Sequence, residues 1–443
     1  MSTIHYGLTI SVRIRPGKRD TLEAVLNKIQ DDGVAENDLF PFGQLSTTHF
    51  ATWVIVPEEE APNGRKLHEQ LLLMTSYTGA RAKHFDELAH VGLKGFHEAF
   101  LHCEGYQFQS SPSVDEMCRF LKKHAIRNTF YTGFQYITHE QAGQENQLRE
   151  AIQGFLDQAW KNGTLADKSA LETRSMIQQF VENQPELAWA TKPYKRSFND
   201  FLRLFGPLIV LGVILGGSLI LSIIFIFTHT LVTTIGLAIF GGFLLTVSLL
   251  LVLLRINESN PHVDVAPPTD ERIYEITSKE IYPVKNEMTV IGTLKKGFIR
   301  RVFLGFTLWL VPFFRAFSYI PTVHTARWLQ IDGGRRLVFI AYFDNTSEGY
   351  AHDFVDSTKR TRNLNLIFGH GKGFPATKWA VGGGGKDRKR YITAVRASQK
   401  ITQLWYSSHN TLGILNLNNN RDIRKGLFGD LDKAQVEEWL LKL

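Results

Sequence analysis

Two histidines precede a glycine–aromatic pair at corresponding places in the two halves of the chain, His102 in HCEGY and His370 in HGKGF. Each follows a segment with helical periodicity, so both are expected in loops, where binding and catalytic groups are common. A neutral imidazole is a frequent general base and the usual protein ligand of haem iron. His102 and His370 are therefore the first candidates for catalytic residues, and histidines with a purely structural role are the alternative.

A second pair of histidines lies on predicted strands, His49 in HFATW and His324 in HTARW. The alternation of side chains along a strand places each imidazole on the same face as the tryptophan four residues later, Trp53 or Trp328. That face could line an apolar interior, and these four residues are our candidates for cofactor binding. The alternative is a pair of histidines that are hydrogen-bonded within a sheet interface and are kept in both halves by ancestry alone.

Three other patterns give weaker indications. Asp353 and Asp356 share a face of a predicted helix, as a metal or acid–base pair would, but a solvated face explains them better. The run GGGGK at 382–386 is followed by Asp387, whereas a phosphate-binding P-loop requires Ser or Thr there. Cys103 has no counterpart in the second half, and the chain has no Cys-x-x-Cys or His-Glu-x-x-His spacing. We therefore predict no metal site.

The longest apolar stretch runs from residue 204 to residue 254, with a polar break at Thr228-His229-Thr230. Each arm is uncharged and long enough to cross a bilayer as a helix, which takes about 20 residues. Two such helices predict a transmembrane helical hairpin, whose two ends emerge on the same side of the membrane. A second apolar segment, 299–319, is too short to span and contains Pro312. It is predicted to lie in the membrane interface, with a buried core helix as the alternative.

Charges next to the hairpin predict its orientation. Basic residues precede and follow it, namely Lys192, Lys195, Arg196, Arg203 and Arg255. By the positive-inside rule both soluble halves are predicted to be cytoplasmic. The net charge of +7 is spread along the 443 residues without a dense basic tract, which does not favour nucleic-acid binding. Two cysteines are too few for a disulfide framework.

The soluble halves repeat one pattern of elements. In the first half strands are predicted near 6–15, 49–56, 70–77 and 128–134, with helices at 19–29, 81–91 and 114–124, which is a ferredoxin-like order. The second half has the same order, and the histidine motifs recur in sequence, so we predict an internal duplication. The predicted fold class is α+β, with two ferredoxin-like repeats forming a pseudo-dimeric α/β barrel. The predicted parts are repeat 1 (1–160), a helix and basic linker (161–203), the hairpin (204–254), a linker (255–280) and repeat 2 (281–443).

This topology resembles the dimeric α/β-barrel superfamily, which includes Dyp-type peroxidases, chlorite-dismutase-like haem proteins and small antibiotic-type monooxygenases. The Gly-x-x-Asp-Gly motif of Dyp-type peroxidases is absent, so no residue role is transferred from them. More closely, HFATW, HCEGY, VKNEMT and NNNRDIRKGLFG resemble a family of uncharacterised bacterial membrane proteins. That closer resemblance implies attachment to the inner (plasma) membrane of a bacterium, but it implies no activity.

Two hypotheses on function follow. The first is a membrane-anchored redox enzyme, haem-dependent and peroxidase-like or oxygenase-like, or free of any cofactor, acting on a lipophilic small molecule. The second is a non-catalytic protein that binds an apolar ligand or serves as a scaffold at the membrane. The expected partners are the lipid bilayer and an apolar small molecule, with a homo-oligomer left open and nucleic acid excluded.

Overall fold

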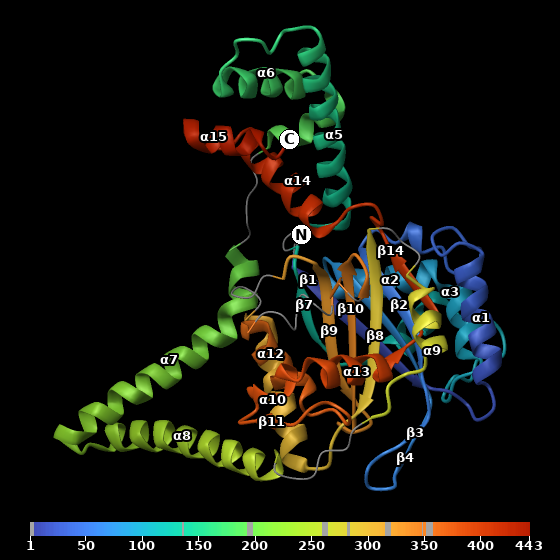
Figure 1. The fold of residues 1–443 in the computed structure, drawn as a ribbon, viewed down its shortest axis with the longest axis vertical. Coiled ribbons are helices and arrows are strands. Elements are labelled where there is room, and N and C mark those ends of the chain that lie inside the picture. The colour runs from blue at the N-terminus through green and yellow to red at the C-terminus, as the bar shows by residue number, and fades with distance from the viewer. Residues whose placement is uncertain are drawn as a thin grey trace.

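The computed structural model describes residues 4–134, 137–192, 198–258, 265–280, 284–314, 320–347, 349–350 and 358–443. These parts form an α+β protein, as predicted, with two five-stranded antiparallel sheets and two short ribbons. Figure 1 shows the two sheets at the centre, with helices on their outer sides. A helical module lies above the sheets, and two long helices extend away from them (Figure 1).

The first sheet combines strands from both halves of the chain. Its order is β14 (Leu404–Ser407), β2 (Thr48–Val56), β5 (Gln70–Thr78), β1 (His5–Arg13) and β6 (Ala125–Ile126). Its outer face is covered by α1 (Arg19–Asp31), η1 (Phe42–Gln44), α2 (Arg81–Val91), α3 (Leu93–Phe100) and α4 (Val114–Lys123). On α1, Leu22, Leu26 and Ile29 form a buried stripe at helical spacing, which is why this segment packs on the sheet.

The second sheet has the order β13 (Gln399–Lys400), β8 (Lys285–Thr293), β10 (Arg336–Asp344), β9 (Val323–Ile331) and β7 (Thr129–Thr132). Its outer helices are α10 (Phe298–Phe314), α12 (Thr358–Phe368) and α13 (Arg388–Ser398), with α9 (Asp270–Thr277) beside strand β13. Smaller elements are the ribbons β3 (Glu59–Glu60) with β4 (Lys66–Leu67) and β11 (Thr377–Lys378) with β12 (Gly382–Gly383), and the turn η3 (Gly384–Lys386).

Each half of the chain contributes its last strand to the sheet of the other half. Strand β7 pairs with β9, with Thr129 opposite Trp328, and β14 pairs with β2, with Leu404 opposite Trp53. The strand order is the same in both sheets when the elements are matched in chain order. The two halves are therefore joined by backbone hydrogen bonds at both outer edges.

The inner faces of the two sheets pack against each other. Phe50 and Val54 of the first sheet lie in one apolar cluster with Leu329 and Ile340 of the second. Arg327 of β9 crosses this layer: its Nη1 donates to the Leu8 carbonyl at 2.7 Å and its Nη2 to the Thr75 carbonyl at 2.5 Å. Burial lowers the pKa of Arg327 to about 10. Layers of helix, sheet, sheet and helix thus follow one another through the molecule.

A helical module continues from the sheets at one end (Figure 1). It comprises α5 (His139–Lys161), α6 (Ala170–Glu182), η2 (Pro185–Thr191), α14 (Ile414–Leu427) and α15 (Lys433–Leu440). Its core includes Leu148, Ile177, Ile423 and Trp439, which come from four different helices. The last residues of the chain therefore pack against the segment that leads into the apolar helices.

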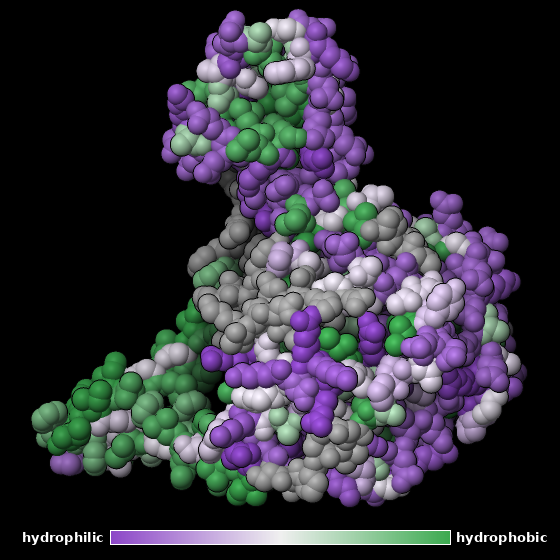
Figure 2. Space-filling model, viewed as in Figure 1, coloured by the Kyte–Doolittle hydropathy of each residue, from purple (hydrophilic) through white to green (hydrophobic). Residues whose placement is uncertain are grey.

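The apolar helices are α7 (Phe198–Thr228) and α8 (Leu231–Glu258). Segments Phe205–Thr228 and Leu231–Glu258, 24 and 28 residues long, are long and apolar enough to cross a membrane. Figure 2 shows them as a hydrophobic arm beside a mostly polar body. The base of α8 is anchored because the Glu258 carboxylate accepts hydrogen bonds from Thr377 Oγ1 at 2.6 Å and from the backbone N–H of Ala380 at 2.9 Å.

Helix α10 corresponds to the predicted interfacial segment 299–319, of which residues 315–319 lie outside the described residues. One side of α10 packs into the second sheet through Leu304 and Leu308, which are buried. The helix also contacts α8. Phe298, Val302, Phe306 and Trp309 are exposed along its length. The helix is thus a core element on one side and an exposed apolar surface on the other.

Candidate functional site

Two β-bulges turn His49 and His324 away from the faces predicted for them. In the pairing of β2 with β5 the register shifts between Thr48 and Phe50, and in that of β9 with β10 it shifts at Tyr342/Phe343, opposite His324. A bulge adds one residue to a strand and redirects its side chain. The expectation that each histidine shares a face with the following tryptophan was wrong. Both imidazoles instead lie between the two sheets.

Trp53 and Trp328 lie on the opposite, outer faces. Trp53 is fully buried and stacks on Phe96 of α3 at a ring-centroid distance of 5.4 Å. Trp328 packs on Phe339 at 5.2 Å within the core under α10 and α12. A complete sheet therefore separates each tryptophan from the histidines with which it was grouped, so the four predicted cofactor-binding residues do not share one cavity.

The two bulge histidines meet at one end of the layer between the sheets. His49 Nε2 lies 3.3 Å from Thr78 Oγ1, and its ring is 4.6 Å from that of His5. His324 Nε2 lies 2.6 Å from the Asp344 carboxylate. The ring of Phe134 packs on both imidazoles. We call His5, His49, His139, His324, His409, Lys285 and Asp344 the histidine cluster.

The rest of this cluster joins the sheets to the helical module. Lys285, the first residue of β8, donates a hydrogen bond to the His409 carbonyl and lies 5.4 Å from the Phe50 ring. His409 Nε2 lies 3.0 Å from the His139 carbonyl at the start of α5. Asp344 accepts from the backbone N–H of Ile414 at 2.8 Å, at the start of α14. Both helices that leave the sheets are thus attached to the cluster.

Burial keeps the bases of the cluster largely uncharged. It lowers the pKa of His324 and of His409 to about 4 each, and lowers that of His49 well below its usual value. The same desolvation lowers the pKa of Lys285 to about 7, against a smaller opposing effect of Asp344. A lysine with such a pKa is partly a free amine near neutral pH, which is the form that acts as a base or nucleophile. Lys285 could therefore accept a proton near neutral pH, whereas His324 and His409 would do so only near pH 4.

His102 and His370 occupy corresponding positions in different helical layers. His102 follows α3 and its Nδ1 lies 3.3 Å from Thr21 Oγ1, at the surface. His370 follows α12, is fully buried, and lies 5.6 Å from the ring of Phe303. Burial and the positive charges of Arg300 and Lys295 lower the pKa of His370 to about 3. His370 is thus held neutral inside a core, and neither histidine belongs to the histidine cluster.

The residues present do not fit a haem. His49 and His324 are both engaged with side chains, Thr78 and Asp344, and both imidazoles pack on the ring of Phe134. A haem bound by either imidazole would have to displace that ring and part of the apolar layer between the sheets, in which Phe134 is buried. Of the described residues, no three His, Cys, Asp or Glu side chains are grouped as metal ligands. Asp353 and Asp356 lie outside the described residues.

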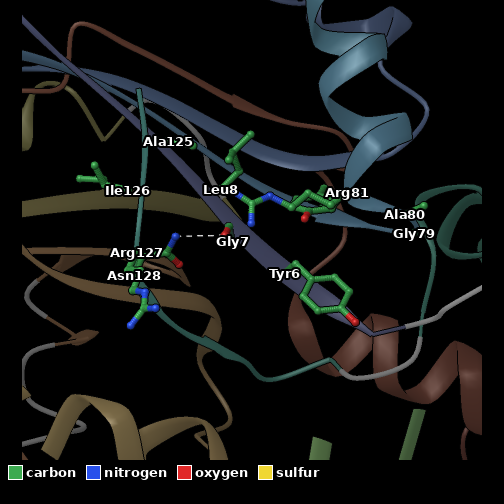
Figure 3. A pocket seen from close by; sticks show the side chains of 11 residues that line it. Tyr6, Gly7, Leu8, Gly79, Ala80, Arg81, Ala125, Ile126, Arg127 and Asn128 are labelled. Carbon is green, nitrogen blue, oxygen red and sulfur yellow. Dashed lines mark hydrogen bonds between the residues drawn. The ribbon is translucent and has the colours of Figure 1, made fainter. Parts of the chain in front are cut away.

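The open pocket of Figure 3 lies on the outer side of the first sheet, at the end of the sheet where the histidine cluster lies. It has a volume of about 670 Å³ and is formed by the start of β1, the end of β5, the start of α2 and the turn between β6 and β7. Tyr6 and Tyr77 supply aromatic surface, with ring centroids 5.7 Å apart. Asn128 closes the pocket near Gly7, whose carbonyl accepts its Nδ2–H at 3.0 Å (Figure 3).

The charges around this pocket are all positive. Arg81 and Arg127 are the charged residues that line it, and both are exposed. Helix α2 begins at Arg81 without a side-chain cap, so its first N–H groups add a positive partial charge. Burial raises the pKa of Tyr77 to about 12, so its hydroxyl stays protonated and can donate a hydrogen bond. The pocket therefore suits a small anion that carries an aromatic or apolar part.

Sequence reasoning missed His5, Lys285, Arg81 and Arg127. His5 and Lys285 occupy the corresponding first positions of β1 and β8. A basic residue at the same place in two corresponding strands is a signal that could have singled them out. Arg81 and Arg127 carry no such signal, because only the tertiary fold brings the start of α2 next to the β6–β7 turn. The unusual pKa of Cys103, raised by burial to about 12, argues against a reactive thiolate there.

No known protein family, curated protein or solved structure matches this chain.

Proposed function

We propose that this chain is a membrane-anchored binding protein that holds a small, partly apolar anion in the pocket of Figure 3. The observation that carries this proposal is the pairing of two tyrosines with two arginines around a pocket of about 670 Å³, which no carboxylate of the described residues lines. Ligand pockets of this size combine apolar walls with a few polar groups that fix orientation. The non-catalytic reading is therefore the first candidate.

The anchor in this proposal is the hairpin of α7 and α8. The apolar side chains of these helices are mostly exposed and are not covered by the other described parts of the chain. Such a large exposed apolar surface is suited to contact with lipid. The basic residues beside the hairpin support two spans with both soluble halves in the cytoplasm, at a bacterial inner membrane. We further propose that the two halves are duplicated ferredoxin-like units forming a pseudo-dimeric α/β barrel, which the matching strand orders and the exchanged last strands support.

The test is isothermal titration calorimetry of the full-length chain in lipid nanodiscs. Naphthalene-2-sulfonate serves as the anionic probe and 2-naphthol as its uncharged counterpart, with empty nanodiscs subtracted. We expect saturable binding of the sulfonate and at least about tenfold weaker binding in Arg81→Gln/Arg127→Gln, because each charge-assisted hydrogen bond contributes about 1.5 kcal/mol or more. Arg119→Gln, an exposed arginine on α4, is the matched control. Equal heats for the two probes, or for the double variant and the control, would argue against the pocket.

The second candidate is the redox enzyme suggested by the sequence resemblance. The specific observation in its favour is the histidine cluster, in which the free-amine form of Lys285 could take a proton from a lipophilic substrate. An absorption spectrum of protein purified from haem-replete cells tests its haem-dependent form. A Soret band that disappears in His49→Asn/His324→Asn would favour that form, and a colourless protein that takes up no added haemin would argue against it.

A further inference from the structure

A smaller pocket, the first of two adjoining basic pockets, lies beside the C-terminal end of α8. It has a volume of about 250 Å³ and is formed by the segment between β8 and α10, the β9–β10 turn and the loop between β3 and β4. Gly297 on its wall approaches α8 so closely that an ideal Cβ there would lie 2.6 Å from Nδ2 of Asn257. Arg300 donates to the Asn257 carbonyl at 3.2 Å. The pocket is therefore fixed at the base of a helix that is long enough to span a membrane.

Four basic residues and, among the described residues, no carboxylate line this pocket. The Nζ of Lys295 donates to the Gly369 and Phe374 carbonyls, at 3.0 and 2.7 Å, which leaves Lys296, Arg301 and Arg335. Arg301 Nη1 donates to the Gly333 carbonyl at 3.2 Å, and Arg335 Nη1 donates to the Asp332 carbonyl at 2.8 Å. These bonds hold both guanidinium groups at the rim and use only part of their five N–H donors. In the described part of the chain none of the three forms an ion pair with a carboxylate.

The basic surface continues into an adjoining pocket of about 300 Å³, which shares Arg335 and adds Arg13 and Arg65. The acidic residue of this second pocket, Asp332, is already paired, because Arg336 Nε lies 2.6 Å from its carboxylate. Lys66 is likewise paired with Glu58 at 2.9 Å. Of the basic residues in these two pockets, Arg13, Arg65, Lys296, Arg301 and Arg335 form no ion pair with a described carboxylate.

An apolar stripe leads from the first pocket along α10. Phe298, Val302, Phe306 and Trp309 recur at helical spacing and are 68%, 37%, 47% and 46% exposed. Arg301 lies beside the first of them, with its guanidinium carbon 5.7 Å from the Phe298 ring. Basic residues thus lie next to one end of an apolar stripe. This arrangement is complementary to a phospholipid, with the basic residues at its charged headgroup and the stripe at its acyl chains.

We propose that the pocket lined by Lys296, Arg301 and Arg335 binds the phosphate group of an anionic phospholipid in the leaflet where α8 ends. Guanidinium groups bind phosphate through paired N–H donors, and the exposed stripe of α10 lies along the acyl chains. The proposal rests on the membrane anchoring proposed above. Free phosphate would satisfy the same donors, but it would leave the apolar stripe without a partner.

The test is native mass spectrometry of the full-length chain, released from detergent after incubation with equal amounts of phosphatidylglycerol and phosphatidylcholine. We expect preferential retention of phosphatidylglycerol. The variant Lys296→Gln/Arg301→Gln/Arg335→Gln should lose that preference by about fivefold per removed charge. Lys83→Gln/Lys94→Gln, two exposed lysines on α2 and α3, is the control and should keep it. Because Arg301 and Arg335 also bond to backbone carbonyls, Lys296→Glu is used as a second variant. The Lys296 side chain forms no hydrogen bond or ion pair with the described residues.

Each outcome decides the proposal. Equal retention in the triple variant, in Lys296→Glu and in the control would overturn it. Complete competition by millimolar inorganic phosphate, which carries no acyl chain, would identify a free-phosphate site and overturn the lipid assignment. Carbonate extraction of native membranes tests the anchor separately. A chain released by carbonate would refute the anchoring, whereas a retained chain without lipid preference would refute only the lipid site.

Discussion

The imidazole rings of His49 and His324 pack on the same phenylalanine, Phe134, at centroid distances of 5.5 and 5.8 Å. The two histidines come from different halves of the chain and from different sheets, and each is placed there by a β-bulge. Phe134 lies just after β7, the strand that crosses to the other sheet. The contact therefore depends on the strand exchange and on both bulges at once.

Replacement of Phe134 by Ala should destabilise the protein strongly. The ring is 1% exposed, and truncating a buried phenylalanine typically costs about 3–5 kcal/mol. Phe134→Leu, which fills more of the space, should cost clearly less. Urea unfolding of the full-length chain in detergent measures both changes. Similar small losses for the two variants would mean that the layer between the sheets is loosely packed at this end.

The fold should lose stability as the pH falls from 6.5 towards 4. The unfolded chain binds a proton at each histidine near pH 6.5, whereas folded His324 and His409 do so only near pH 4. The unfolded state thus binds more protons in this window, and the loss at pH 5 is on the order of 2 kcal/mol for each such histidine. Urea midpoints at pH 5 and 7.5 measure this loss.

Glu287 acts in the opposite direction and supplies the control. Burial raises its pKa to about 7, so between pH 4.5 and 7 the folded state holds a proton that the unfolded state has lost. This single group favours the fold at low pH and offsets part of the histidine effect. Glu287→Gln should therefore make the stability fall more steeply towards pH 5. A pH-independent midpoint in both proteins would contradict the buried, neutral histidines.

Gly7 should not tolerate a side chain. An added Cβ would lie 2.7 Å from Asn128 Oδ1 and 2.9 Å from the Arg327 guanidinium. Gly7→Ala should therefore cost about 1–3 kcal/mol through overpacking and should weaken binding in the neighbouring pocket. Gly154→Ala, in the middle of α5 with open space around it, should instead stabilise by up to about 1 kcal/mol. Thermal unfolding of both variants checks the two opposite signs.

Gly236 of α8 should be required for close packing of the two apolar helices. Its position faces Leu221 of α7 so closely that an added Cβ would clash with that side chain. Gly236→Leu should push the helices apart and lower the midpoint of thermal unfolding in detergent, whereas Gly241→Leu, which faces open space, should not. Equal midpoints for the two variants would show that the helices do not pack through this face.

Local patterns were sufficient to predict several elements of the fold. Helix α1 begins at Arg19 as predicted, and the apolar run with its polar break corresponds to α7 and α8. The exchange of β7 and β14 could not be read from the sequence, because the periodicity of a strand does not identify its partner. The packing of α15 on α6 could not be predicted either, because the apolar face of a helix does not identify the distant segment that covers it.

The candidate site was only partly predictable. His49 and His324 were identified as a pair, but strict alternation put them on the wrong faces, because a single extra residue in a bulge inverts the side-chain direction. Lys285 was missed because its importance arises from burial at a strand end, which composition does not reveal. Arg81 and Arg127 are ordinary exposed arginines in sequence and become neighbours only through the fold.

Photolabelling tests the central claim, an anion-binding pocket on a membrane-anchored protein, most directly. The full-length chain in lipid nanodiscs is irradiated with 4-azidobenzenesulfonate, with and without excess naphthalene-2-sulfonate, and the labelled peptides are mapped. The account predicts labelling that the competitor prevents, confined to peptides that contain Tyr6, Tyr77 or residues 125–128. Labelling that resists the competitor, or that is concentrated on the helical module or α10, would contradict it.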